Sequence, residues 1–342
     1  MSLKSNLALS YDDVLLKPMY SDIRSRKEIN ISTNLEKGLE LQLPIFSSPM
    51  DTISESAMAS TMNKHGASAI IHRYNTIKEQ VSHIEKIQHP KLVGAAIGVS
   101  ADYLERASAA AEAGAAFVCI DVAHGHHIMM KEALYEIRKL FGDDYHIMAG
   151  NVATLEGVND LADWGADSVR CNIGGGSICS TRIQTGHGLP GLQTIIECAR
   201  TDRNVKIIAD GGIRNSGDMV KALAAGADAL MIGSLLAGTT ETPGEINLGP
   251  DGSRWKTYRG MASKEAQINW KGKYSSFEGI SSRVPHRGTA ADILSDLERG
   301  IRSGFSYTGA RNLLELQSKS EFVRQTTSGL SESRTHISTR KW

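Results

Sequence analysis

One glycine-rich segment of the chain carries a cysteine near its centre. Residues 172–192 read N-I-G-G-G-S-I-C-S-T-R-I-Q-T-G-H-G-L-P-G-L, and the cysteine is Cys179. Glycines let a backbone approach a phosphate closely and turn its N–H groups toward it. Hydrogen-bond donors also stabilise a thiolate, which is the nucleophilic form of cysteine. The segment therefore predicts covalent catalysis on a phosphorylated substrate.

Two further glycine turns follow short apolar runs later in the chain. Gly211–Gly212 comes after the run at 206–209, and Gly233–Ser234 comes after the run at 229–232. With Ser177 and its preceding glycines, they make three turns rich in N–H and O–H donors, which suit a phosphate. Asp210 directly precedes one of these turns. Its carboxylate suits the two hydroxyls of a ribose, although a structural ion pair is the alternative.

The elements that must position these groups repeat along the chain. Four segments share a Gly-Ala pair between a helical stretch and an apolar run: K-H-G-A-S-A-I-I from Lys64, E-A-G-A-A-F-V-C from Glu112, D-W-G-A-D-S-V-R from Asp163 and A-A-G-A-D-A-L-M from Ala224. Glycine ends the helix and the apolar residues begin a buried strand. With the other apolar runs, this predicts eight strands near residues 45, 69, 93, 117, 146, 168, 206 and 229.

Eight evenly spaced units predict a parallel (β/α)8 barrel, the TIM-barrel fold of the α/β class. A doubly wound sheet is the alternative, but it rarely has eight such even repeats. In a barrel, catalytic groups follow the carboxyl ends of the strands. The positions predicted to do so are 48–52, His72, 121–124, Asn151, the Cys179 loop, 210–212 and 233–234.

We expect residues 1–342 to form a single catalytic barrel domain, with the first 43 residues preceding the first strand. A polar insertion at about 238–288 is longer than a compact domain usually tolerates, so we interpret it as an active-site lid; a solvated excursion is the alternative. We expect residues 289–304 to form the last amphipathic helix. The polar tail at about 326–342 is expected to be mobile or to order only in an oligomer.

Composition excludes several classes of function. Lys plus Arg equals Asp plus Glu at 38 each and aromatic residues are only 6%, so nucleic acid is not an expected partner. No apolar run approaches a membrane span and no signal peptide is evident, so a cytoplasmic protein is expected. Cys119 and Cys171 are predicted to be core residues. The histidines His72, His124, His126 and His127 lack a metal-ligand pattern and are interpreted as loop or cofactor-side packing.

Longer motifs resemble one family. They are D-D-V-L-L-K-P from Asp12, S-S-P-M-D-T from Ser47, G-N-V-A-T from Gly150, G-S-I-C-S-T-R from Gly176, D-G-G-I-R-N-S-G-D from Asp210, G-S-L-L-A-G from Gly233, Y-R-G-M from Tyr258 and R-S-G-F-S-Y-T-G-A from Arg302. In kind and order, from about Leu9 to His336, they resemble the IMP dehydrogenase / GMP reductase family. The motifs are too long and specific for chance similarity.

The resemblance implies roles for individual residues. Cys179 would attack C2 of the purine ring of a nucleoside 5′-monophosphate and form a thioimidate. The implied substrate-binding residues are Ser48, Asp210 at the ribose, Ser177, Gly212, Gly233, Ser234 and Tyr258 at the phosphate, and Met261, Ala262 and Glu278 at the base. Asp121 and Asn151 would line the nicotinamide side. The carbonyls of Gly174, Gly176 and Cys179 match positions that hold a monovalent cation, K⁺, in many relatives. The resemblance also implies a homotetramer, in which the region of Glu332 would complete a neighbour's cation site.

The direction of the reaction follows less directly from the resemblance. Ser47-Ser48-Pro49 and Ile213-Arg214 favour an IMP dehydrogenase, which converts IMP, NAD⁺ and water to XMP and NADH. Three features favour a GMP reductase, which converts GMP and NADPH to IMP, NADP⁺ and ammonia: no regulatory insertion appears near residue 90, the stretch from Met261 to Glu278 is short, and the Arg-Tyr pair of the dehydrogenase lid is replaced by Lys273-Tyr274.

A reductase pairs the threonine of its cysteine loop with a lid glutamate. Thr181 matches the threonine, but the glutamate position falls on Lys264, with Glu265 adjacent. We therefore predict a GMP reductase that uses NADPH, with Cys179, Thr181 and Glu265 as catalytic residues. The alternatives are an IMP dehydrogenase that uses NAD⁺, a nucleotide-binding barrel without turnover, and a flavin-dependent barrel with the same phosphate turns.

Overall fold

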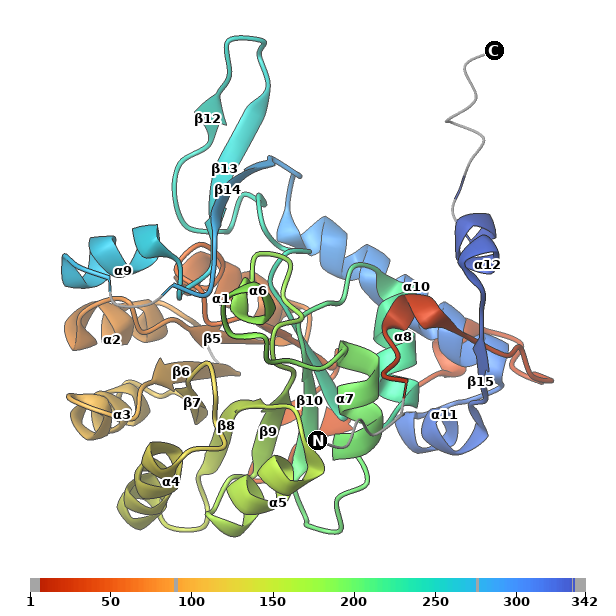
Figure 1. Ribbon diagram of the computed structural model, residues 1–342, viewed down its shortest axis with the longest axis horizontal. Coiled ribbons are helices and arrows are strands. Elements are labelled where there is room, and N and C mark those ends of the chain that lie inside the picture. Colours follow the sequence, from red (N-terminus) through yellow and green to blue (C-terminus); the bar gives the residue numbers. More distant parts are fainter. Residues whose placement is uncertain (1–6, 89–91, 275–276, 334, 336–342) are drawn as a thin grey trace.

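Eight parallel strands close into a barrel with helices around it, as the computed structural model in Figure 1 shows. The structure describes residues 7–88, 92–274, 277–333 and 335. The barrel strands are β4 (Ile45–Ser47), β5 (Ser68–Ile71), β6 (Val93–Ile97), β7 (Phe117–Asp121), β8 (His146–Val152), β9 (Ser168–Cys171), β10 (Lys206–Asp210) and β11 (Ala229–Ile232).

Each barrel strand pairs in parallel with the next one along the chain, and β11 pairs with β4 to close the ring. All eight strands lie where the sequence predicts them. The (β/α)8 prediction is therefore confirmed and the doubly wound alternative is wrong. Closure brings the carboxyl ends of all eight strands to one rim, where the polar groups that follow them meet.

The helices that follow successive strands begin and end at residues with clear physical roles. They are α1 (Ser56–Lys64), α2 (Ile77–Glu85), α3 (Tyr103–Glu112), α4 (Ile128–Phe141), α5 (Leu155–Asp163), α7 (Gly191–Cys198), α8 (Ser216–Ala224) and α10 (Ala290–Thr308). The four repeated glycines, Gly66, Gly114, Gly165 and Gly226, all have positive φ angles. A residue with a Cβ is strained in that conformation, so glycine is the residue that ends these helices. Thr289 caps α10, which runs four residues beyond the predicted end.

Two apolar layers hold the barrel together. The inner layer includes Phe46, Phe117, Met148 and Met231, all fully buried, and the two phenylalanine rings meet edge to face at 5.7 Å. The outer layer packs the strands against the helices. Leucines of the hairpin formed by β2 (Thr33–Asn34) and β3 (Glu40–Leu41) join the inner layer. The hairpin also carries Lys37, which pairs with Asp167 just before β9, so it closes the amino end of the barrel.

The insertion after β11 folds into its own small sheet and a helix. Strands β12 (Asn247–Leu248), β13 (Arg254–Arg259) and β14 (Ser281–Pro285) form an antiparallel sheet, and α9 (Lys264–Lys271) lies between β13 and β14. In Figure 1 the β12–β13 ribbon projects away from the barrel, whereas α9 lies beside it. Only part of the insertion therefore has the position of a lid.

The two ends of the described chain meet. Strand β1 (Val14–Leu16) pairs antiparallel with β15 (Phe322–Arg324), which follows α11 (Leu313–Lys319). The tail then forms α12 (Thr327–Glu332), so its first part is ordered within one chain. The remainder of the predicted tail, 334 and 336–342, lies outside the described residues. No helix among the residues described is long and apolar enough to cross a bilayer.

Candidate functional site

A cavity of about 330 Å³ opens at the carboxyl ends of the strands. Sixteen of the seventeen residues predicted for the site line it: Ser48, Asp121, Asn151, Gly174, Gly176, Ser177, Cys179, Thr181, Asp210, Gly212, Gly233, Ser234, Tyr258, Met261, Ala262 and Glu278. Glu265 is the exception. Residues separated by more than two hundred positions in the sequence thus converge on one space.

The Cys179 loop is fixed by its own turn and by the lid. The Gly176 carbonyl accepts the Cys179 N–H at 3.1 Å, and the short helix α6 (Thr181–Thr185) begins two residues later. The lid runs antiparallel to the loop here: Ser180 N–H donates to the Glu278 carbonyl at 2.8 Å, and Ile280 N–H donates to the Ile178 carbonyl at 3.0 Å. These two bonds hold the end of the lid against the half-buried thiol.

A hydrogen-bonded chain leads from the thiol to a carboxylate. Cys179 Sγ donates to Thr181 Oγ1 at 3.1 Å, and Thr181 Oγ1 donates to Glu278 Oε2 at 2.8 Å. The chain connects a nucleophile to a proton acceptor through one hydroxyl. Such an arrangement can remove a proton from sulfur and return it later.

The prediction that Glu265 partners Thr181 is therefore corrected, because the partner is Glu278. Glu265 is exposed in the first turn of α9, whose next two residues face inward. The short antiparallel contact between lid and cysteine loop passes through Gly279, and this places Glu278 beside Thr181.

The two lid lysines named as alternatives do not reach the cavity. Lys264 Nζ lies 4.7 Å from the centre of the Tyr274 ring, a cation–π contact on the surface of the lid. Lys273 is exposed. Among the described residues, the lid contributes no lysine or arginine to the lining of the cavity.

The phosphate turns pack closely against one another. A Cβ on Gly233 would lie 3.3 Å from the Tyr258 hydroxyl and 3.4 Å from Ser48 Oγ, so these three residues surround one point. The Tyr258 hydroxyl also lies 3.5 Å from Ser177 Oγ. Burial raises the pKa of Tyr258, so its hydroxyl stays protonated and able to donate. Gly212, at φ 76°, lets the turn after β10 approach the cysteine loop.

A buried ionic cluster forms another part of the cavity lining. Arg170 donates to Asp121 Oδ1 at 2.5 Å and to Asp210 Oδ2 at 2.8 Å. Asn151 Nδ2 donates to the same Asp210 oxygen at 2.7 Å. Burial opposes the positive charge of Arg170, but the two carboxylates outweigh it and raise the guanidinium pKa. The four residues come from four consecutive strands of the barrel, β7 to β10.

Sequence reasoning missed several residues of the lining, namely Arg73, Tyr74 and Arg170. Arg170 had a visible signal, because it is the one charged residue in the apolar run from Ser168 to Cys171. Arg73 and Tyr74 follow β5 directly, so the barrel rule for strand ends points to them as well.

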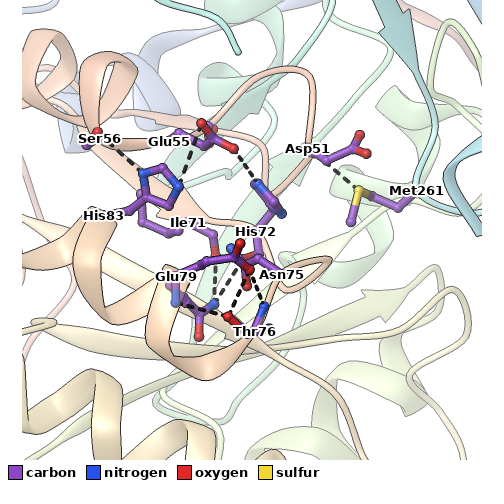
Figure 2. A network of polar contacts seen from close by, with 12 residues as sticks. Asp51, Glu55, Ser56, Ile71, His72, Asn75, Thr76, Glu79, His83 and Met261 are labelled. Atoms are coloured by element: carbon purple, nitrogen blue, oxygen red, sulfur yellow. Dashed lines mark hydrogen bonds and ion pairs between the residues drawn. The ribbon is translucent and has the colours of Figure 1, made fainter. Parts of the chain in front are cut away.

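A polar network behind the cavity holds the segments after β4 and β5 (Figure 2). His72 Nε2 lies 3.0 Å from Glu55 Oε1, and His83 lies on the other side of the same carboxylate. Met261 Sδ accepts the Asp51 N–H at 3.2 Å, which links the lid to the segment after β4. His72, predicted at the rim, thus supports the site without lining the cavity.

Cys119, Cys171, His126 and His127 have structural surroundings, whereas His124 is exposed. Cys119 and Cys171 are fully buried, as predicted, and burial raises the pKa of Cys119 to about 12. His126 pairs with Asp160 at 2.7 Å, and His127 caps α4 by accepting the Met129 N–H. Within the described ranges, no group of three or more His, Cys, Asp or Glu side chains could hold a metal ion.

Known proteins match almost the whole chain. Residues 8–336 match the IMP dehydrogenase / GMP reductase domain. An inosine-5′-monophosphate dehydrogenase from Cryptosporidium parvum is 36% identical, with 96% of this chain and 94% of that protein aligned. A GMP reductase from Leishmania major is 30% identical, with 96% of each aligned. The crystal structure of a cysteine-to-alanine variant of GMP reductase from Trypanosoma brucei, in complex with guanosine 5′-monophosphate, superposes with a TM-score of 0.91. It is 29% identical and covers 97% of this chain and 98% of its own.

Proposed function

Because the chain belongs to the IMP dehydrogenase / GMP reductase family of oxidoreductases, which use nicotinamide cofactors, we propose that it is a GMP reductase. It would act on C2 of the purine through Cys179. The observation that carries this proposal is the hydrogen-bonded chain from Cys179 through Thr181 to Glu278.

The shape and chemistry of the cavity support a nucleoside monophosphate as substrate. The turns at Ser177, Gly212 and Gly233, with Ser234 and Tyr258, would hold the phosphate, and Asp210 would hold the ribose. Ser48 would add a contact between them, and the lid residues Met261 and Ala262 would face the base. The purine C2 would then lie over Cys179.

The three-residue chain accounts for the protons of the reaction. The Cys179 thiol passes its proton through Thr181 to Glu278, and the sulfur bonds to C2 of GMP. The C2–N bond breaks, and the proton from Glu278 leaves with the amino group as ammonia. When C2 gains a hydride, the C2–S bond breaks and leaves a thiolate. Glu278 takes up one proton from solvent, and that proton reaches the sulfur through Thr181, so each turnover consumes one solvent proton. The two transfers within the protein join atoms 3.1 and 2.8 Å apart.

A nicotinamide cofactor would supply the hydride. The lining of the cavity also offers the Asp121 carboxylate, the Asn151 amide and the Arg73 guanidinium, a set that fits a polar, anionic dinucleotide. Asp121 and Asn151 would line the nicotinamide side, and NADPH is the proposed form.

The lid favours the reductase direction. Hydrolysis of the thioimidate by a dehydrogenase needs a base for water, and the described lid residues bring no arginine to the cavity. The missing regulatory insertion favours neither direction, because the alignment with the Leishmania major GMP reductase spans 475 residues against the 342 of this chain. That reductase therefore also carries internal residues that this chain lacks.

A cation site and an oligomer complete the proposal. The carbonyls of Gly174, Gly176 and Cys179 are hard oxygen ligands of the kind that hold K⁺. The Gly176 carbonyl also accepts the Cys179 N–H, so a bound cation would share it with the turn. A homotetramer is proposed from the family, with the region of Glu332 near a neighbour's cation site.

A paired assay tests the proposed function. We expect GMP plus NADPH to lose NADPH absorbance and release ammonia without added potassium. Formation of NADH and XMP from IMP and NAD⁺ with potassium would instead identify an IMP dehydrogenase. Tight GMP binding without turnover in either assay would identify a nucleotide-binding barrel and overturn the proposal.

A further inference from the structure

Arg170 is the most deeply enclosed charged group of the cavity wall. Its side chain is only 7% exposed, and it stands in β9 between the strands that carry Asp121 and Asp210. Nε and Nη2 both donate to Asp210 Oδ2, at 3.0 and 2.8 Å, while Nη1 donates to Asp121 Oδ1 at 2.5 Å. One planar guanidinium therefore fixes two carboxylates from non-adjacent strands.

Each carboxylate keeps its second oxygen for the cavity. Among the described residues, no hydrogen bond reaches Asp210 Oδ1, and Asp210 lines the cavity. In the described part of the chain, the one cation paired with Asp121 Oδ2 is Arg73, whose Nε lies 3.8 Å away, too far for a hydrogen bond. The guanidinium thus satisfies one oxygen of each carboxylate and leaves the other oxygen available to a ligand in the cavity.

We propose that Arg170 is a positioning residue that couples the nucleotide site to the cofactor site. The inference rests on the proposed function, in which Asp210 holds the ribose of the nucleotide and Asp121 lies on the nicotinamide side. A ligand that reorients one carboxylate moves the shared guanidinium and so acts on the other carboxylate. Binding of either ligand therefore prepares the site for the other.

The residues around Arg170 restrict the movement of its side chain. A Cβ on Gly150 would lie 2.6 Å from Arg170 Cβ, so the neighbouring strand packs directly against the base of the side chain. Cys119 Sγ lies 3.5 Å from Nη1 at its far end. A guanidinium also presents its donors in a fixed plane, whereas the lysine ammonium is a single point charge that cannot hold both carboxylates with this geometry.

A purely structural role is the competing explanation, because a buried ion pair can simply hold three strands together. Buried pairs contribute little net stability, but breaking one is costly. Stability alone therefore cannot separate the two explanations. The coupling between the two sites can separate them. If Arg170 only held the strands together, a change at Asp121 would not alter GMP binding through Arg170.

The experiment is a double-mutant cycle read by GMP binding in the absence of cofactor. Dissociation constants are measured by calorimetry for the native protein, Asp121→Asn, Arg170→Lys and the double variant. We expect Asp121→Asn to weaken GMP binding at least about fivefold in the native background. With Arg170→Lys already present, Asp121→Asn should change GMP binding by less than about twofold.

A matched control is Arg138→Lys, which alters a largely buried arginine that pairs with the Asp167 carboxylate, outside the cavity lining. It should lower stability and leave the GMP dissociation constant unchanged. If Arg170→Lys does not fold, Arg170→Gln replaces it in the same cycle. If Asp121→Asn changes the GMP dissociation constant equally with and without Arg170, the inference is wrong. Turnover of GMP by the native protein would still uphold the proposed function. Absence of GMP binding by the native protein would overturn both.

Discussion

Each end of the barrel carries an ionic cluster centred on an arginine, but the two clusters have different roles. At the amino end, Arg138 donates to Asp167 Oδ2 at 2.7 Å and to the carbonyls of Gly165, Gly142 and Tyr145. At the carboxyl end, Arg170 joins Asp121 and Asp210. Both arginines are largely buried; Arg138 joins the segments that precede β8 and β9, and Arg170 joins residues of β7 and β10.

The difference lies in what remains unsatisfied. Asp167 also accepts the Ile147 N–H at 2.7 Å, and its other oxygen pairs with Lys37. Asp228, just before β11, has the same role, because it accepts the Ile207 N–H at 2.7 Å. Carboxylates at the amino end thus complete the ends of strands, whereas those at the carboxyl end keep oxygens for a ligand. Charged groups at the amino end therefore stabilise the fold, whereas those at the carboxyl end are placed where the active site of a barrel lies.

The largest effect that separates the two ends is expected from the proton chain. Glu278→Gln removes the carboxylate that accepts the Thr181 hydroxyl and that we propose as the acceptor of the thiol proton. We expect kcat to fall by about a hundredfold or more, with GMP binding changed much less. Glu265→Gln is the matched control, since it makes the same substitution on an exposed part of the lid. It should keep kcat within about twofold, and equal losses in the two variants would refute the assignment of Glu278.

A smaller effect, on stability alone, is expected at the amino end. His146 begins β8, is fully buried, and lies 2.8 Å from Ser168 Oγ. Burial lowers its pKa from 6.5 to about 4. Between these values the unfolded chain binds a proton that the folded protein does not, so stability falls as the pH drops through this window.

The variant His146→Gln should reduce that loss. It removes the titrating group, and we expect the loss of unfolding free energy between about pH 7.5 and about pH 5 to shrink by roughly 2 kcal/mol. GMP affinity at neutral pH should not change, because His146 lies at the end opposite the cavity. Urea unfolding at the two pH values measures the effect, and an unchanged pH dependence contradicts it.

The smallest effect is expected from a surface cluster at the amino end. Arg203 pairs with Asp163 at 3.1 Å and with Asp202, and all three side chains are well exposed. Water and salt screen such pairs, so Arg203→Ala should leave both the unfolding midpoint and GMP turnover unchanged within error. A clear loss of stability would mean that the amino end depends on its surface charges as well as its buried ones.

The barrel could be predicted from the sequence because its signals are local. A glycine that ends a helix and an apolar run two residues later predict a strand whatever the rest of the chain does, as at Gly165 and Gly226. The cavity followed from the same logic, since barrel strands end at one rim. The predicted residues that follow strands, among them Ser48, Asp121 and Asp210, line it for that reason. The lid residues Tyr258, Met261, Ala262 and Glu278 were expected there from the resemblance to the family.

The lid could not be predicted in the same detail, because its register depends on contacts with a distant segment. Nothing local to Glu265 or Glu278 shows that Gly279 runs antiparallel to Cys179. Arg170 was missed for a related reason. A charge inside an apolar strand is visible, but its two partners, 49 and 40 positions away, become clear only when the barrel closes.

Trapping the Cys179 adduct tests the central claim most directly. The protein is mixed with GMP and cofactor, quenched in acid during turnover, and analysed by intact mass and peptide mapping. We predict a mass increase equal to GMP minus ammonia on the peptide that contains Cys179, and none in Cys179→Ala. Turnover of GMP without an adduct in the native protein, or full turnover by Cys179→Ala, would contradict covalent catalysis at this loop.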